Sequence, residues 1–181
     1  MCGFTGYFKG RAYGEDILHK MGNALVHRGP DESGTWLDKS VQIGLSHQRL
    51  AVIDCSPAGN QPMVSSSGRY VMVFNGEIYN HQKLRQMINN IVFKGDSDTE
   101  TLLESIEKMG LEESLKRSEG MFALALWDRK TRSLYLARDR IGEKPLYYGW
   151  QGKGSEASFL FGSELNALKQ HPAFGASINR D

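Results

Sequence analysis

Cysteine is scarce in this sequence, with two residues among 181, and one of them stands at position 2. Two cysteines are too few for a disulfide framework, so we expect both to be thiols in a reducing, cytoplasmic setting. An excess of one charge is also lacking, because 22 Lys and Arg balance 21 Asp and Glu without a long block of either sign. This balance argues against nucleic acid or an acidic membrane surface as the partner.

Long apolar runs are absent as well. The longest are of strand length, and the first ten residues, MCGFTGYFKG, lack the basic start and the apolar stretch of a secretory signal. The sequence has no G-x-x-x-x-G-K-[ST] phosphate loop and no spacing of His, Cys and Asp typical of a metal site. We therefore expect a protein outside the membrane that carries no ATP site, cofactor or metal of its own.

The length and a hydrophobic content of 40% fit one domain over residues 1–181. Apolar residues at helical spacing predict three amphipathic helices, near 17–25, 84–91 and 102–109. Runs rich in β-branched and aromatic residues predict strands at about 41–53, 69–75, 120–127, 133–138, 145–150 and 158–163.

The predicted strands are expected to pair antiparallel, since gaps such as 128–132 are too short for a helical crossover. Two of them, VMVF at 71–74 and MFALAL at 121–126, are apolar on both alternating faces, which predicts burial on both sides. The sequence thus favours an α+β fold of stacked antiparallel sheets with helices as the outer layers.

Cys2 directly follows Met1, so removal of the initiator methionine would leave a chain that begins with cysteine. Such a residue combines a thiol nucleophile with an α-amine whose ordinary pKa is about 7.7–8.0, so no separate catalytic histidine is required. Gly3 and Gly6 would allow close backbone approach around the thiol, and Phe4 would begin a buried strand. Position alone is better explained by a frayed terminus that tolerates most residues.

Five short segments downstream of Cys2 change that balance. In chain order they are His27-Arg28-Gly29-Pro30-Asp31, Gln48-Arg49-Leu50-Ala51-Val52-Ile53-Asp54, Phe74-Asn75-Gly76-Glu77-Ile78-Tyr79-Asn80, Ser97-Asp98-Thr99-Glu100 and Ala137-Arg138-Asp139-Arg140-Ile141-Gly142. From Cys2 to about Leu168 the chain resembles the glutaminase domain of glutamine-dependent asparagine synthetases, which are class II glutamine amidotransferases. The resemblance implies a four-layer αββα N-terminal nucleophile hydrolase fold, in which Cys2 attacks the side-chain amide of glutamine.

The same resemblance implies roles for other residues. The Asn75 side-chain amide and the Gly76 backbone N–H would form an oxyanion hole. Arg49 would bind the α-carboxylate of glutamine with its planar fork, and Asp98 and Glu77 would face the α-ammonium. The neighbouring residues that complete the predicted pocket are Leu50, Val52 and Ile53.

Three of these residues also have a simpler explanation. Asn75-Gly76 is the commonest dipeptide of hairpin turns, and Arg49 alone would be read as a solvated strand charge. Asp98 lies in the segment 97–100, a capping box that would start a helix, although a carboxylate in a first helical turn can still face a ligand.

A Cys–His pair built on Cys55 is the main rival mechanism, with His27, His47 or His81 as the base. Cys55 lies in the segment 54–57, DCSP, which lacks the G-x-C-x-G turn that presents a strained nucleophile. A small buried or loop thiol is the more natural interpretation of Cys55.

In asparagine synthetases the glutaminase domain precedes an ATP-pyrophosphatase-like domain that activates aspartate and receives the ammonia. The stretch 161–168 resembles the join between these domains, so we expect ATP and Mg²⁺ only in a synthetase domain absent from this sequence, acting in cis or in trans. Glucosamine-phosphate synthases carry a Trp-Ala-Thr-His type segment where this chain has residues 50–53, which favours the asparagine synthetase branch. The alternatives are an enzyme that amidates a surface-polysaccharide sugar and a catalytically silent glutamine-binding module.

Overall fold

The computed structural model describes residues 1–11 and 13–176, and this part of the chain contains nine β-strands and five α-helices. In chain order they are β1 (Gly3–Phe8), α1 (Glu15–Asn23), β2 (Glu32–Asp38), β3 (Ile43–Arg49), β4 (Met63–Val64), β5 (Tyr70–Ile78), α2 (His81–Met87), α3 (Asp98–Met109), α4 (Leu111–Arg117), β6 (Gly120–Asp128), β7 (Ser133–Arg138), β8 (Tyr147–Gln151), β9 (Ser158–Gly162) and α5 (Leu165–Leu168).

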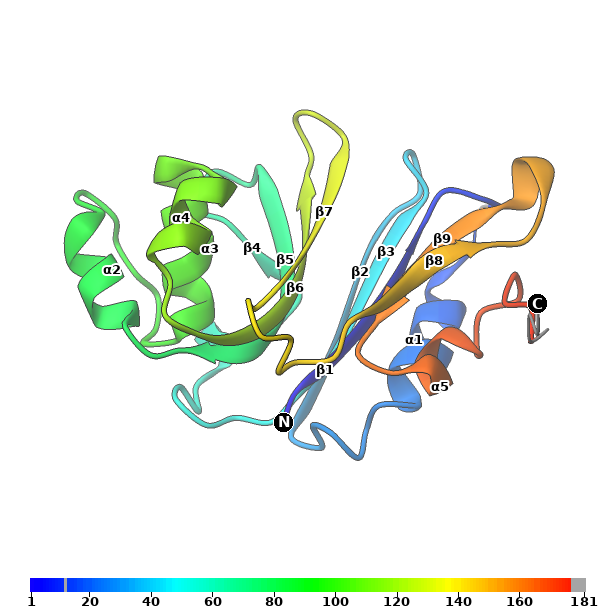
Figure 1. The fold of residues 1–181 in the computed structure, drawn as a ribbon, viewed down its shortest axis with the longest axis horizontal. Helices are drawn as coiled ribbons and strands as arrows, with labels where there is room; N and C mark the ends of the chain where they lie inside the picture. Colours follow the sequence, from blue (N-terminus) through cyan, green and yellow to red (C-terminus); the bar gives the residue numbers. More distant parts are fainter. Residues whose placement is uncertain (12, 177–181) are drawn as a thin grey trace.

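The strands form two stacked antiparallel sheets (Figure 1). One sheet has the order β2-β3-β1-β9-β8 and the other the order β4-β5-β6-β7. Helices α1 and α5 cover the outer face of the first sheet, while α2, α3 and α4 lie outside the second (Figure 1). The predicted four-layer αββα sandwich of the α+β class is confirmed.

Strands β5 and β6 are buried on both faces, as their apolar composition predicts. Val71 and Val73 of β5 point into the gap between the sheets, whereas Met72 and Phe74 point toward the helices. This alternation follows from the two-residue period of a strand, and it needs apolar residues at every position because both faces are covered. The residues that fill the gap between the sheets are Phe4, Ile43, Leu45, Val71, Val73, Ala123, Ala125, Trp127 and Phe161.

Two predicted elements end four residues earlier in the structure. The strand predicted over 41–53 ends at Arg49, because both neighbouring strands stop there: Gly3 pairs with Gln48, and Glu32 pairs with Arg49. The helix predicted over 84–91 ends at Met87, ahead of Asn90, which has a positive φ of 63°.

Four elements had no expectation in the sequence. Strand β2, ESGTWLD, lies at the edge of its sheet and is partly exposed, so it lacks the apolar alternation that marks a buried strand. Strand β4 and helix α5 are only two and four residues long. Helix α4, LEESLKR, packs two leucines against the core but is otherwise polar.

Candidate active site

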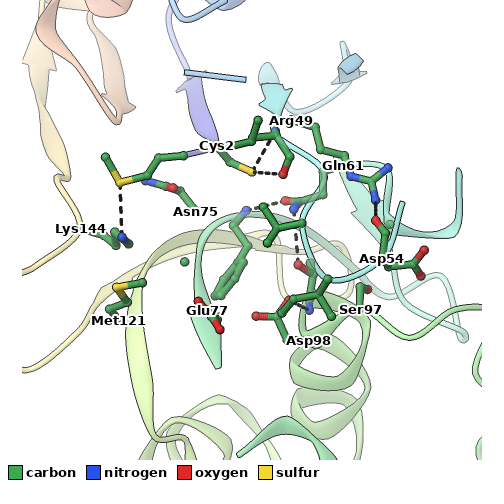
Figure 2. A pocket seen from close by; sticks show the side chains of 18 residues that line it. Cys2, Arg49, Asp54, Gln61, Asn75, Glu77, Ser97, Asp98, Met121 and Lys144 are labelled. Atoms are coloured by element: carbon green, nitrogen blue, oxygen red, sulfur yellow. Dashed lines mark hydrogen bonds between the residues drawn. The ribbon is translucent and has the colours of Figure 1, made fainter. Parts of the chain in front are cut away.

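A cavity of about 180 Å³ lies where β1 begins and β3 ends, next to the middle of β5 and the first turn of α3 (Figure 2). The nine residues that the sequence nominates all line it: Cys2, Arg49, Leu50, Val52, Ile53, Asn75, Gly76, Glu77 and Asp98. They come from four separate segments, so the fold has brought together what the motifs only placed in order along the chain.

Cys2 reaches the cavity because β1 is a central strand that pairs with β3 on one side and β9 on the other. Its Sγ lies 3.4 Å from the backbone N and 3.5 Å from the carbonyl O of Leu50. Burial raises the pKa of the Cys2 thiol, while the Leu50 N–H and the positive charge of Arg49 oppose that rise. Met1 still precedes Cys2 in this structure and also lines the cavity.

The two glycines beside Cys2 serve different contacts. A Cβ on Gly3 would lie 2.9 Å from Cδ of Arg28, whose Nε donates to the Cys2 carbonyl O at 2.9 Å. A Cβ on Gly6 would lie 2.5 Å from the ring of Phe161. Gly3 therefore leaves room for the Arg28 side chain to bind the main chain next to the thiol, as expected. Gly6 leaves room for the Phe161 ring in the packing between the sheets.

Asn75 faces Cys2 across the gap between the two sheets. The two-residue period of a strand puts Cys2 on the same face as Phe4, and Asn75 on the same face as Val73. The Asn75 side chain is 1% exposed, and its Nδ2 has no hydrogen-bond acceptor among the described residues. Asn75 and Gly76 lie inside β5, so the hairpin-turn interpretation of this dipeptide is wrong.

The backbone N–H of Gly76 points to the same cavity. Along β5 the N–H of Phe74 donates to Oε1 of Gln61 at 2.6 Å, and that of Ile78 donates to Oδ2 of Asp98 at 2.8 Å. Alternate N–H groups of a strand point to the same edge, so the Gly76 N–H lies between these two bonds on the edge that faces away from β6. A Cβ at Gly76 would lie 2.3 Å from the Met121 carbonyl O, so a larger residue would disturb the pairing with β6.

Asp98 lies both in the first turn of a capped helix and at the cavity wall. Helix α3 begins at Asp98, capped by Ser97 Oγ, which accepts from the Glu100 N–H at 3.1 Å. The reciprocal half of the capping box is missing, because the Glu100 carboxylate accepts from the N–H groups of Lys94 and Gly95 instead. Burial raises the pKa of the Asp98 carboxyl, and the side chain still lines the cavity.

Arg49 is buried, with 5% exposure, so the solvated-strand interpretation is wrong. Its guanidinium donates to Glu32 Oε2 at 2.7 Å, Asn60 Oδ1 at 2.6 Å and Ser56 O at 3.0 Å, and it also contacts the Asp54 carbonyl O. These bonds hold the loop 50–60 over the cavity. A substrate carboxylate at Arg49 would share the guanidinium with that loop.

Gln61 and Lys144 are among the residues of the cavity wall that were missed. Gln61 accepts the Phe74 N–H and so fixes β5 next to Asn75. Lys144 is 5% exposed, and its Nζ lies 3.4 Å from Met1 Sδ. The signal for Lys144 was its place two residues after the segment 137–142; Gln61 had no recognisable pattern around it.

The rival Cys–His arrangement is not formed. Cys55 is exposed, and His27 pairs with Glu164 at 3.1 Å. Nε2 of His47 lies 3.0 Å from the Phe74 carbonyl O, and burial lowers the pKa of His47 to about 4, so its ring is neutral with the proton on Nε2. No described histidine is hydrogen-bonded to Cys55.

Neither a metal-binding cluster nor a membrane-spanning helix is found among the described residues. Over residues 1–11 and 13–176, no group of three or more His, Cys, Asp or Glu side chains is arranged to hold a metal ion. Over the same residues, no helix has the length and apolar content needed to span a bilayer.

Known proteins support an assignment to a family. The family described as the glutamine amidotransferase domain matches residues 1–181. Asparagine synthetase (glutamine-hydrolysing) 3 of Bacillus subtilis is 40% identical over 187 residues, which cover 99% of this chain and 29% of that protein. Putative asparagine synthetase (glutamine-hydrolysing) 2 of Methanocaldococcus jannaschii is 35% identical over 185 residues, covering 93% and 35%. Amidase chry2 of Gibberella zeae is 40% identical over 125 residues, covering 68% and 18%. This chain spans about a third or less of the length of these relatives, and it belongs to the glutamine amidotransferase domain family.

Proposed function

We propose that this domain hydrolyses glutamine to glutamate and ammonia, with Cys2 as an N-terminal nucleophile after removal of Met1. The observation that carries the proposal is the Asn75 amide, which is buried and has no acceptor among the described residues, yet faces Cys2 next to the Gly76 N–H. A buried unpaired donor costs about 1–3 kcal/mol. Such a donor is understandable where a negative charge forms during the reaction.

In the first half of the reaction, the α-amine of Cys2 takes the thiol proton while Sγ attacks the side-chain amide carbon of glutamine. The carbonyl oxygen becomes an oxyanion that accepts from Asn75 Nδ2–H and Gly76 N–H. When the C–N bond breaks, the proton held by the α-amine passes to the departing nitrogen, so ammonia leaves and a thioester remains.

In the second half, water attacks the thioester carbon and gives up a proton to the α-amine. The same two donors hold the second oxyanion. The C–S bond then breaks, the proton returns to Sγ, and glutamate is released, so Cys2 ends in its starting state.

The amino-acid end of glutamine needs a cation and an anion in the opposite part of the cavity. We assign the α-carboxylate to Arg49 and the α-ammonium to Asp98 and Glu77. The support is electrostatic, because the wall of the cavity that holds Cys2 carries both signs of charge (Figure 2). Leu50, Val52 and Ile53 would close the pocket above the substrate.

We further propose that the ammonia serves an ATP-dependent amidation by a synthetase domain, in cis or in trans, in the cytoplasm. The support is that the relatives named above as asparagine synthetases extend well beyond the matched region. Those names favour aspartate over a sugar as the acceptor. ATP and Mg²⁺ would then bind to the synthetase domain, and the whole of residues 1–181 would form the glutaminase domain.

The test is glutamate release by the purified chain whose first residue is Cys2, as verified by intact mass. Cys2→Ala is expected to abolish release while the circular dichroism spectrum stays unchanged, and Cys55→Ser is the matched control that retains activity. Glutamine binding without glutamate release by the parent protein would instead establish the silent binding module. Loss of activity in a folded Cys55→Ser variant would return the nucleophile to Cys55.

A further inference from the structure

Lys144 places a buried positive charge in the same cavity as Cys2. The side chain is 5% exposed, and Figure 2 shows it with Met121 at the end of the cavity away from Asp54. Among residues 1–11 and 13–176, no carboxylate lies within 4 Å of its Nζ, and Met1 Sδ lies 3.4 Å from Nζ. A thioether sulfur is a weak acceptor, so the ammonium is not balanced locally.

The other cations near Cys2 are paired with carboxylates. Arg28 Nη1 lies 2.9 Å from Glu164 Oε1, and Arg49 Nη1 lies 2.7 Å from Glu32 Oε2. Lys144 is therefore the cation of the cavity wall whose charge is not cancelled by a close partner among the described residues.

Hydrogen bonds to the main chain of Lys144 hold this residue in position. Its N–H donates to Asp139 Oδ2 at 3.0 Å, and its carbonyl O accepts from Arg138 Nε at 2.5 Å. Asp139 Oδ2 also accepts from the N–H of Phe122 at 3.2 Å, which ties the loop to β6. A buried charge on a fixed main chain, without a carboxylate to neutralise it, calls for an explanation other than fold stability.

We propose that the Lys144 ammonium keeps the α-amine of mature Cys2 uncharged and its thiol reactive at neutral pH. The inference rests on the function proposed above, because it concerns the residue that begins the chain once Met1 has left. Removal of Met1 takes away the recorded contact of Nζ and creates the α-amine at the adjoining position. Lys144 would then act on Cys2 through the electrostatic field and need not touch the substrate.

A second positive charge is disfavoured in a cavity that already holds one, so the ammonium lowers the affinity of the α-amine for a proton. The same charge favours the thiolate and the oxyanion, which are both negative. The carboxylates that face the cavity, Asp54, Glu77 and Asp98, act in the opposite sense. Asp54 is tied to the N–H of Asp96 at 2.8 Å, and Asp98 to that of Ile78, so both are held by other partners.

The size of the expected pH shift follows from the distance between Nζ of Lys144 and the backbone nitrogen of Cys2, which the Met1 side chain spans. Two unit charges about 9 Å apart at an effective dielectric constant of about 20 change a titration midpoint by about one pH unit. Neutralising Lys144 should therefore move the acid limb of activity about one pH unit toward higher pH.

The experiment uses the chain that begins at Cys2, in a Cys55→Ser background, with Lys144→Met and Lys144→Gln as neutral variants and Lys144→Arg as the matched control. The first readout is the rate of Cys2 alkylation by iodoacetamide against pH, followed by intact mass. The second is the pH profile of kcat/KM for glutamate release. Circular dichroism identifies the variants that fold.

We expect both profiles of a folded neutral variant to move about one pH unit upward, while Lys144→Arg superimposes on the parent. Superimposed profiles for the neutral variants would overturn the inference, as would an equal displacement in Lys144→Arg. Alkylation does not require glutamine hydrolysis, so the two proposals are separable: a parent that releases no glutamate but whose alkylation midpoint depends on Lys144 would overturn the proposed function and leave the charge assignment standing.

Discussion

Replacing Asn75 with alanine is expected to impair catalysis without destabilising the fold. The change removes the Nδ2 donor that faces Cys2 and leaves the Gly76 N–H in place. Loss of one oxyanion donor is expected to lower kcat by about 10²–10³-fold, equivalent to roughly 2.7–4 kcal/mol of transition-state stabilisation. KM should change much less, because the oxyanion does not exist in the bound ground state.

The same substitution should leave stability nearly unchanged. Nδ2 has no acceptor among the described residues, so no recorded hydrogen bond is lost, and about 1–3 kcal/mol of burial cost disappears. That gain offsets the small cavity left by a truncated side chain. We expect the free energy of unfolding in urea to stay within about 1 kcal/mol of the parent value.

Asn80→Ala is the matched control, because it is the same substitution at a residue outside the cavity. Asn80 Nδ2 donates to the Arg117 carbonyl O at 2.8 Å, and its Oδ1 accepts from the Glu119 N–H at 3.0 Å. Loss of two bonds should cost about 1–2 kcal/mol of stability with kcat unchanged. If Asn75→Ala retained kcat within a factor of three, or if it destabilised the chain as Asn80→Ala does, the assignment of Asn75 as an oxyanion donor would be refuted.

Three further predictions concern the chain start, the pocket and acid stability. A protein that retains Met1 or an N-terminal tag should release no glutamate until a protease exposes Cys2, because an amide nitrogen cannot accept the thiol proton; full activity before cleavage would mean that the α-amine is not the base. Arg49→Lys should raise KM for glutamine roughly 10–100-fold, since lysine keeps the charge but loses the fork; an unchanged KM in steady-state assays would remove Arg49 from the carboxylate site. The folded-state pKa of His47 is lowered to about 4, so stability should fall as pH drops from about 6.5 to 4, by roughly 3 kcal/mol in all. Urea titrations at pH 7 and pH 4.5 measure this loss, and His47→Gln should lessen it if His47 is its source.

Sequence alone predicted the elements whose burial is visible in their composition. The segments 71–74 of β5 and 121–126 of β6 are apolar at every position, and both strands were found with nearly correct bounds. Strand β2 was missed because it lies at the edge of its sheet and is partly exposed to solvent, so few of its residues are apolar. The end of β3 at Arg49 is set by where β1 and β2 begin, and that information lies elsewhere in the chain.

The same distinction holds in the cavity. The nine nominated residues could be predicted because each belongs to a motif that can be recognised along the chain, and all of them line the cavity. Gln61 stands in no such motif and Lys144 lies two residues beyond one, and the importance of both depends on what they contact in three dimensions. Gln61 matters through the N–H of Phe74, and Lys144 through its approach to the N-terminus, 143 positions away from Met1 in sequence.

A chain terminus is normally a poor place for a nucleophile, because the first residues of a domain tend to fray. Here β1 is the central strand of its sheet, and the residue next but one to Cys2 is held from the other end of the chain. The Phe4 N–H donates to Ser163 Oγ at 3.1 Å, and the Ser163 N–H donates to the Phe4 carbonyl O at 2.8 Å. On the other side Gly3 pairs with Gln48 of β3, directly before Arg49. The position of the thiol is therefore fixed by strands from both halves of the domain. This would let the proposed nucleophile meet the proposed donor on the opposite sheet with the accuracy that acyl transfer requires.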